Sequence, residues 1–159
     1  MRYKVREKIF AIGDAFTIED EHGNAAFKVK SKILSFRNRM EMEDASGKDV
    51  ATMHKKIVAF FETWTVEIAG GPAVKVRRGI KLFGSRFSIS GGGEKLDARG
   101  SFYDYNFEIT RGGRTAAVVS KKFFALSDTY GVEVADGEDP ALMMALVIVF
   151  DQIFHEERD

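Results

Sequence analysis

The sequence contains no cysteine, which excludes a disulfide framework, a thiolate nucleophile and a zinc site held by cysteine. It has only two prolines, Pro72 and Pro140, and no low-complexity stretch that would predict a linker between domains. Its 24 basic and 24 acidic residues leave no net charge, so we expect no specific binding of nucleic acid driven by bulk attraction. A length of 159 residues is typical of one domain, and we expect a single domain over residues 1–159.

Long apolar runs are also absent, with one exception near the end of the chain. The first ten residues, MRYKVREKIF, contain no apolar segment of the kind that a secretory signal requires, so a cytoplasmic location is expected. The exception is the apolar run from Ala141 to Phe150, which is far shorter than the roughly 20 residues of a membrane span. We therefore expect a protein that is not transmembrane, although a peripheral position at a membrane is compatible with this sequence.

Six segments of the chain resemble one another at spacings of 24, 24, 23, 22 and 21 residues. They read VREKIF from Val5, VKSKIL from Val29, MHKKIV from Met53, VRRGIK from Val76, ARGSFY from Ala98 and VSKKFF from Val119. Each segment is followed by a shorter pattern of large apolar, polar and aliphatic residues. The large residues of the short patterns are Phe16, Met40, Trp64, Phe87, Phe107 and Tyr130. Both patterns alternate with period two, which indicates strands, so each repeat predicts a pair of strands.

Twelve sequential strands predict a particular architecture. Closing the sheet into a barrel removes its exposed edges, but twelve strands enclose a lumen too wide for side chains alone to fill. The apolar run from Ala141 to Phe150 predicts a helix that is buried on every side and about 10 Å across, which suits that lumen. The sequence therefore predicts a mainly β fold, a closed twelve-stranded antiparallel β-barrel of six two-strand repeats at about 2–135. The barrel would enclose a C-terminal hydrophobic α-helix at about 139–155.

Two stretches carry a resemblance to a known family. They are FTIEDEHGNAAFKVKSKILSF at 16–36 and SKKFFALSDTYGVEVADGEDPALMMALVIVFDQIFHEE at 120–157. On these residues the chain resembles the LURP-one-related family, with its YxjI-type bacterial members, in the tubby C-terminal-like superfamily. The resemblance implies a phospholipid scramblase-like fold, a twelve-stranded barrel around a central hydrophobic helix. It also implies lipid binding, because tubby-like domains bind phosphoinositides and scramblases act on phospholipids, while LURP-one members mostly lack an assigned activity.

Motifs of catalysis are not found in the sequence. The glycine-rich GGGEK at 91–95 lacks the Gly-Lys-Ser/Thr of a phosphate loop, and a turn explains it. DGED at 136–139 lacks the alternating ligands of a calcium loop, and helix capping explains it. We therefore expect no catalytic residue, cofactor or metal, and a non-enzymatic protein.

Basic residues, in contrast, recur at equivalent strand positions. They form a candidate surface for an anionic lipid or a protein partner, consisting of Lys28, Lys30, Lys32, Arg37, Arg39, Lys56 and Arg77. Each basic residue near an anionic membrane contributes about 1 kcal/mol, although lysines on an outer strand face are also an ordinary solvated surface. Strict alternation points Ser31, Lys55, Arg78 and Lys121 inward, so we expect a bulge or bend near the barrel rim to turn them outward.

The turns after the long strands gather at one end of such a barrel. They bring together aromatic and basic residues. The aromatic residues there either plug the mouth of the barrel or meet a membrane interface. These are Phe36, Phe60, Phe61, Phe83, Tyr103 and Tyr105 with Arg37, Arg39, Lys81 and Arg86. The leading hypothesis is a module that binds anionic phospholipid or phosphoinositide headgroups or a membrane-associated protein. The alternative is a carrier that holds a small apolar ligand in a partly open lumen, and the sequence does not indicate an oligomeric state.

Overall fold

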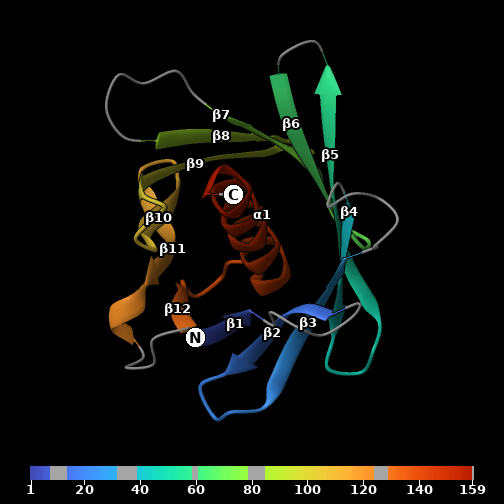
Figure 1. The fold of residues 1–159 in the computed structure, drawn as a ribbon, viewed down its shortest axis with the longest axis vertical. Helices are drawn as coiled ribbons and strands as arrows, with labels where there is room; N and C mark the ends of the chain where they lie inside the picture. The colour runs from blue at the N-terminus through green and yellow to red at the C-terminus, as the bar shows by residue number, and fades with distance from the viewer. Residues whose placement is uncertain (8–13, 32–38, 59–60, 79–84, 124–128, 159) are drawn as a thin grey trace.

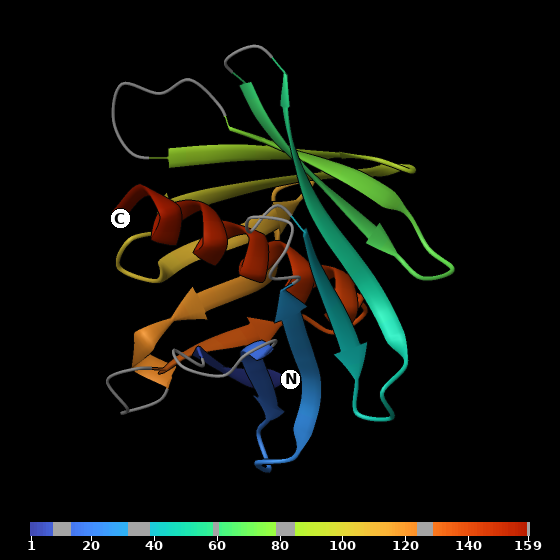
Figure 2. The same cartoon turned by 45° about the vertical axis from the view of Figure 1, so that its right-hand side comes forward.

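The chain folds into a closed barrel of twelve antiparallel strands around one helix (Figures 1 and 2). The computed structural model describes residues 1–7, 14–31, 39–58, 61–78, 85–123 and 129–158. The strands are β1 (Arg2–Glu7), β2 (Asp14–Asp20), β3 (Ala25–Ser31), β4 (Arg39–Asp44), β5 (Asp49–Val58), β6 (Phe61–Ile68), β7 (Ala73–Arg78), β8 (Ser85–Gly91), β9 (Glu94–Ser101), β10 (Asn106–Arg111), β11 (Arg114–Ser120) and β12 (Thr129–Val134). A 3₁₀ helix, η2 (Lys121–Phe123), follows β11, and the helix α1 (Pro140–Arg158) follows β12.

Each strand pairs with its neighbours in the sequence, and β1 closes the barrel by pairing with β12. The predicted fold class is therefore confirmed, down to the number of strands. Closure protects the strands at the two ends of the sheet, because a sheet that closes on itself exposes no unpaired edge.

The six repeats place their large residues on the inner face of the barrel. Phe16, Met40, Trp64, Phe87, Phe107 and Tyr130 are all buried, with exposed fractions of 1–6%. The first residues of the long patterns, Val5, Val29, Met53, Val76, Ala98 and Val119, are buried beside them. Since cross-strand partners share a face, pairs such as Met40 with Met53 line the lumen together.

The helix fills this lumen. Its side chains from Leu142 to Phe150 are buried on every side, as the uninterrupted apolar run predicts. Asp139 caps the helix start, because its carboxylate Oδ1 accepts a hydrogen bond from the amide of Ala141 at 3.0 Å. The helix has 19 residues, which corresponds to a length of about 28 Å and carries it through the barrel.

The direction of the helix distinguishes the two ends of the barrel. It starts where the odd-numbered strands start, because Glu138 lies beside Arg111 at the turn between β10 and β11. We call this the start end. It finishes where the odd-numbered strands finish, because Phe154 lies beside Arg78, the last residue of β7. We call this the mouth, and Figure 1 looks into it.

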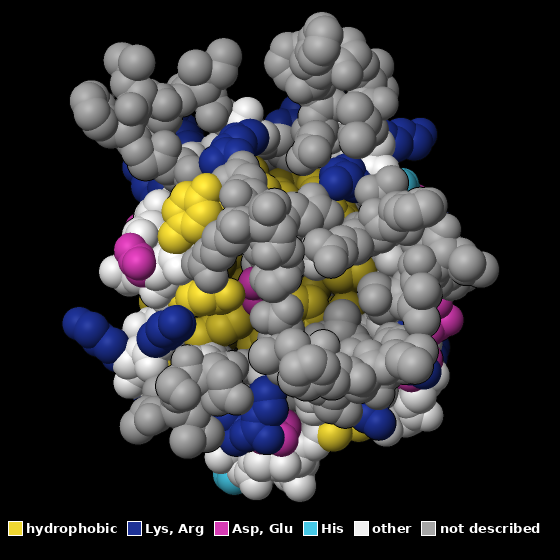
Figure 3. Space-filling view, viewed as in Figure 1, with side chains coloured by type: hydrophobic (Ala, Val, Ile, Leu, Met, Phe, Trp, Pro, Cys, Tyr) yellow, Lys and Arg dark blue, Asp and Glu magenta, His cyan; other side chains and the backbone are white. Residues whose placement is uncertain are grey.

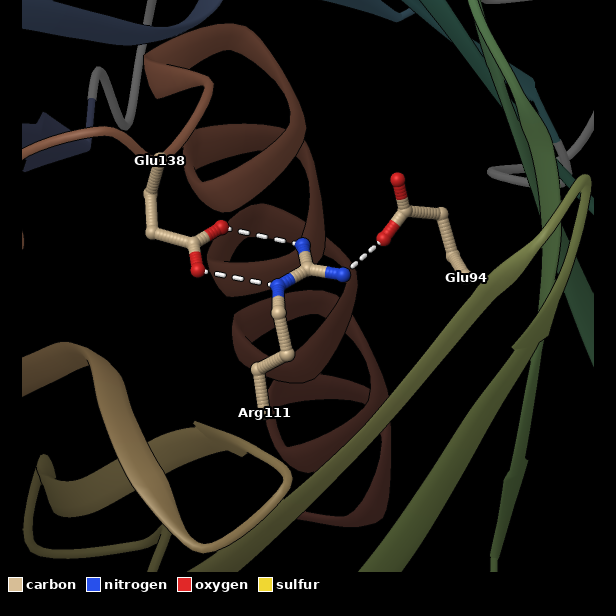
Figure 4. Close-up of polar contacts among 3 residues, drawn as sticks. All are labelled: Glu94, Arg111 and Glu138. Atoms are coloured by element: carbon tan, nitrogen blue, oxygen red, sulfur yellow. Dashed lines mark hydrogen bonds and ion pairs between the residues drawn. The ribbon is translucent and has the colours of Figure 1, made fainter.

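An ion-paired cluster holds the start of the helix against the barrel (Figure 4). Arg111 donates two hydrogen bonds to the carboxylate of Glu138, both of 2.9 Å, and a third to Glu94 at the start of β9. The exposed fraction of the side chain is 28% for Arg111, 15% for Glu138 and 24% for Glu94, so the cluster is partly shielded from solvent. These hydrogen bonds, that from Glu138 first, raise the pKa of the Arg111 guanidinium above its ordinary value.

A charge placed in the centre of the helix tests whether the helix is the filling of the barrel. Leu146→Asp puts a carboxylate at a position that is 0% exposed, and we expect it to cost several kcal/mol of an ordinary stability of about 5–15 kcal/mol. The variant should be insoluble or unfolded by circular dichroism. Leu146→Met, which nearly conserves volume, should lower the free energy of unfolding by less than about 1.5 kcal/mol. A Leu146→Asp variant that melts like the wild type would contradict the buried position.

Removing the guanidinium at the start end tests the ion-paired cluster. Arg111→Met leaves the carboxylates of Glu138 and Glu94 without this donor, and we expect a loss of about 2 kcal/mol in the free energy of unfolding in urea. Arg114→Met is the matched control, because Arg114 is exposed in the same turn and forms no ion pair with the described residues. Equal effects of the two substitutions would show that the cluster does not hold the helix.

Candidate functional site

The outer wall carries the first part of the predicted basic surface. The Nζ atom of Lys30 lies 3.1 Å from Oε1 of Glu43, and Nε of Arg39 lies 3.6 Å from Oε1 of Glu41. Lys28 is exposed and stands opposite Glu43 in the register of β3 and β4. The wall here is therefore a surface of alternating charge. Lys32 and Arg37, which the sequence also predicts for this surface, lie outside the described residues.

The mouth carries a denser set of cations, which we call the cationic rim. Its members lie on the last residues of odd-numbered strands or directly after them. The cationic rim consists of Arg6, Lys55, Lys56, Arg77, Arg78, Arg99, Lys121 and Lys122. All of these side chains are exposed except Lys55, which is half-buried. Lys56 and Arg77 of the predicted surface thus belong to the cationic rim.

Three members of the cationic rim lie over aromatic rings. Lys55 Nζ is 6.0 Å from the ring centroid of Trp64, and Lys121 Nζ is 5.0 Å from that of Tyr105. The Arg78 guanidinium is 5.2 Å from the ring of Phe154, a residue of α1. A cation over a ring face is stabilised by about 0.5–2 kcal/mol, and cations also suit the negative end of the helix dipole.

The predicted bulge at these positions is wrong for Lys55 and Arg78. Lys55 pairs with Trp64 and Arg78 with Phe87 without a shift of register, so both residues stay on the inner face. The aromatic rings at the mouth accept the cations there, and no bulge is needed to expel them. At Lys121 the chain does leave the sheet, because β11 ends at Ser120 and η2 begins. The recorded shifts lie elsewhere, in β2, β4 and β10.

Below the cationic rim lies a buried carboxylate that sequence reasoning missed. Asp151 of α1 is 6% exposed and accepts hydrogen bonds from the hydroxyls of Tyr130, at 2.9 Å, and Tyr105, at 3.1 Å. The two tyrosine rings stack with their centroids 4.5 Å apart. The sequence signals Asp151 only as the polar residue that directly follows the apolar run. Its hydrogen-bond partners lie 21 and 46 residues away along the chain, so the pattern does not predict them. This network joins the end of the helix to β12 and to the turn between β9 and β10.

Aromatic side chains close part of the mouth. Phe102 is 3% exposed and stacks on Phe107 at 4.4 Å and on Phe154 at 5.0 Å, whereas Tyr103 is 45% exposed. Tyr103 and Tyr105 thus lie at the predicted end. Nothing is described of the side chains of the other aromatic residues predicted there, which are Phe36, Phe60, Phe61 and Phe83. Figure 3, viewed from the mouth, shows hydrophobic side chains in a central area with Lys and Arg around them.

The start end has the opposite character. It carries the acidic residues Asp20, Glu21, Asp44, Asp49, Glu67, Glu94, Glu133, Asp136, Glu138 and Asp139. The carboxylates of Asp20 and Asp44 occupy equivalent turns, and each accepts backbone hydrogen bonds from residues two and four positions later. The pKa of the Asp20 carboxyl is lowered chiefly by the backbone hydrogen bond from Asn24. The pKa of the Asp44 carboxyl is lowered chiefly by a further hydrogen bond, which the Ser46 hydroxyl donates at 2.6 Å. The acids described at this end outnumber its basic residues, among them Arg2, Lys48, Lys95, Arg111 and Arg114. The molecule is therefore electrically polar along the helix axis although its net charge is zero.

Pockets in the described part of the chain are found at the start end. One of about 340 Å³ is lined by Glu94, Arg111, Glu138 and Asp139 among others, and one of about 520 Å³ is lined by Met1, Arg2 and Glu133 among others. The carboxylates of Glu94 and Glu138 converge on Arg111 rather than on open space. Among the described residues no cluster of three or more His, Asp or Glu could hold a metal ion. No described helix has the length and apolar character to span a membrane.

Comparison with known proteins agrees with this architecture. The chain is 30% identical to an uncharacterized protein, YxjI, of Bacillus subtilis (strain 168) over 91 residues. That match covers 57% of the chain and 55% of YxjI, so it spans about half the length of this relative. A crystal structure of a protein from Arabidopsis thaliana superimposes with a TM-score of 0.70 at 21% identity, over 96% of this chain and 91% of that one. At this identity the likeness shows the fold.

The model of one protein family matches nearly the entire chain. The family is described as LURP-one-related, and its model matches residues 1–151, from the start of β1 to Asp151 in α1. The matched residues contain all twelve strands and the buried apolar run of the helix from Leu142 to Phe150. The chain belongs to the LURP-one-related family.

Proposed function

We propose that this protein is a non-enzymatic module that binds anionic phospholipid headgroups through its cationic rim. The observation that carries the proposal is the concentration of eight basic residues at one end of a molecule without net charge. Among the described acids near this end, Glu41 pairs with Arg39, and Asp97 pairs with Arg86. Glu108 is half-buried opposite Arg99 in the register of β9 and β10, Asp151 is buried, and Asp104 is exposed. An anionic surface is attracted to such an end and repelled by the other.

The geometry of the cationic rim supports a flat partner. Its members come from β1, β5, β7, β9 and the segment after β11, which are spread around the barrel rather than gathered on one strand. A membrane can contact all of them at once, because its charges form an extended layer. At about 1 kcal/mol for each basic residue near an anionic surface, several contacts are enough for reversible binding.

The outer wall is a weaker candidate for the same contact. Lys28, Lys30 and Arg39 alternate with Glu41 and Glu43, so a headgroup there meets both signs of charge. A carboxylate beside a basic residue lowers the attraction of that residue to an anionic surface. We therefore assign these residues a secondary role, at the flank of the cationic rim.

The carrier hypothesis receives less support from the packing. The helix residues that face the lumen, Leu142, Met143, Leu146, Val149 and Phe150, have exposed fractions of 0–2%. The described pockets are at the surface and have charged linings, which do not suit an apolar ligand.

Vesicle flotation tests the proposal. The protein is mixed with vesicles of phosphatidylcholine alone, or with added phosphatidylserine or phosphoinositide, at low and at high salt. We expect binding to the anionic vesicles that salt weakens. The triple variant Lys56→Ala, Arg77→Ala, Lys122→Ala should bind on the order of 100-fold more weakly, because it lacks three contacts of about 1 kcal/mol each.

The start end offers a matched control. Lys48→Ala, Lys95→Ala and Arg114→Ala together remove the same charge from exposed residues at that end and should leave flotation unchanged. Lys28→Ala with Lys30→Ala should have a smaller effect than the rim variant. Equal losses in the rim and start-end variants would contradict a localised site. Failure of the wild type to float with any vesicle would contradict lipid binding and direct the search to an acidic protein partner.

A further inference from the structure

We propose that the turn between β9 and β10, residues Phe102–Tyr105, is the part of the molecule that enters the membrane interface, with Tyr103 as the inserting side chain. This inference rests on the proposed function and specifies which point of the mouth meets the lipid. It fixes an orientation in which the helix axis points toward the bilayer with the mouth leading.

Tyr103 is exposed in a way that is unusual for this molecule. Its exposed fraction is 45%, and the other large hydrophobic residue described as exposed is Met1, at the start end. The ring of Tyr103 stands edge-on to Phe154 at 4.7 Å, and Phe154 stacks on the buried Phe102. The ring of Tyr103 thus packs against side chains that belong to the core. A tyrosine with an apolar ring and a polar tip suits the headgroup level of a bilayer.

The turn is held rigidly in place. Gly100 has φ of +141°, and a Cβ there would approach the carbonyl oxygen of Asn106 to 2.6 Å, so only glycine allows β10 to come this close. Tyr105 has a positive φ of 51°, which is uncommon for a bulky residue. In this conformation its hydroxyl donates a hydrogen bond to Asp151, and its ring contacts both Tyr130 and Lys121. A turn fixed before binding loses little conformational freedom when it meets a surface.

Three cations lie around the turn, which are Arg78 over Phe154, Lys121 over Tyr105, and the exposed Arg99 near the end of β9. Two carboxylates also lie close to the turn. Glu108 is half-buried opposite Arg99 in the register of β9 and β10, and Asp104 is exposed and accepts a hydrogen bond of 2.5 Å from the hydroxyl of Ser101. Its carboxylate opposes anionic lipid and therefore limits the affinity, which makes it a point where a substitution should strengthen binding.

Fluorescence quenching by brominated lipid tests the insertion. The wild type contains one tryptophan, Trp64, which is 1% exposed and provides the background. Tyr103→Trp places a second tryptophan at the turn, and His22→Trp places one in an exposed turn at the start end. With vesicles of brominated phosphatidylcholine and phosphatidylserine, we expect strong quenching of the Tyr103→Trp variant beyond the wild-type background and none of the His22→Trp variant.

Two further substitutions separate the apolar from the electrostatic contribution. Tyr103→Ser should weaken flotation on the order of tenfold by the same factor at low and high salt, because the lost contribution is burial of the ring. Asp104→Asn should strengthen binding to anionic vesicles about fivefold, and the matched Asp136→Asn at the start end should not.

The outcomes distinguish this inference from the function on which it rests. If the wild type floats with anionic vesicles but tryptophans at 103 and 22 are quenched equally, or neither is quenched, the insertion is wrong and lipid binding stands. A Tyr103→Ser variant that binds as the wild type does would contradict the insertion in the same way. If the wild type does not float, both proposals fail.

Discussion

The structure depends on one constraint, which is that a closed barrel of twelve strands must be filled. A lumen of this width would otherwise be empty or wet, and interiors of proteins are packed to the density of organic crystals. The helix α1 meets the constraint because its residues 142–150 are apolar in every direction and can face the whole circumference. Each part therefore requires the other. The helix is too apolar to be exposed to water, and without the helix the barrel would enclose an unfilled lumen.

The orientation of the helix in turn gives the molecule two different ends. At its start, Asp139 caps the first turn and Arg111 joins Glu138 to Glu94, in an environment rich in carboxylates. At its end, Asp151 is anchored by two tyrosines, and cations lie over aromatic rings. Acids near a helix start and bases near a helix end are each favoured by the helix dipole. A separation of charge that stabilises the helix thereby also creates a cationic surface at the mouth.

Much of this architecture could be predicted from the sequence, because period-two patterns and six repeats report directly on strands and their number. The helix was predicted at about 139–155 and is found at Pro140–Arg158, since both its cap and its apolar run are local signals. What sequence could not predict depends on partners that only closure of the barrel brings together. The neutralisation of Lys30 by Glu43 requires the register of β3 and β4, and the buried bonds of Asp151 join residues of three different elements. The expected bulge at Lys55 and Arg78 was wrong because alternation predicts the face of a residue but not the aromatic neighbour that makes an inward cation acceptable.

Native-state hydrogen exchange, followed by NMR over increasing denaturant, tests most directly whether the helix and the barrel form one cooperative unit. The account predicts that amides in the middle of the helix, such as those of Leu146 and Val149, exchange only through the same opening as barrel amides such as those of Val66 and Val132. The free energy of this opening should equal that of global unfolding. Helix amides that exchange through an opening of lower free energy, while the barrel amides stay protected, would contradict it. In that case the barrel would be stable without the helix. The constraint that the lumen must be filled would then not hold, and it would not explain the difference between the two ends.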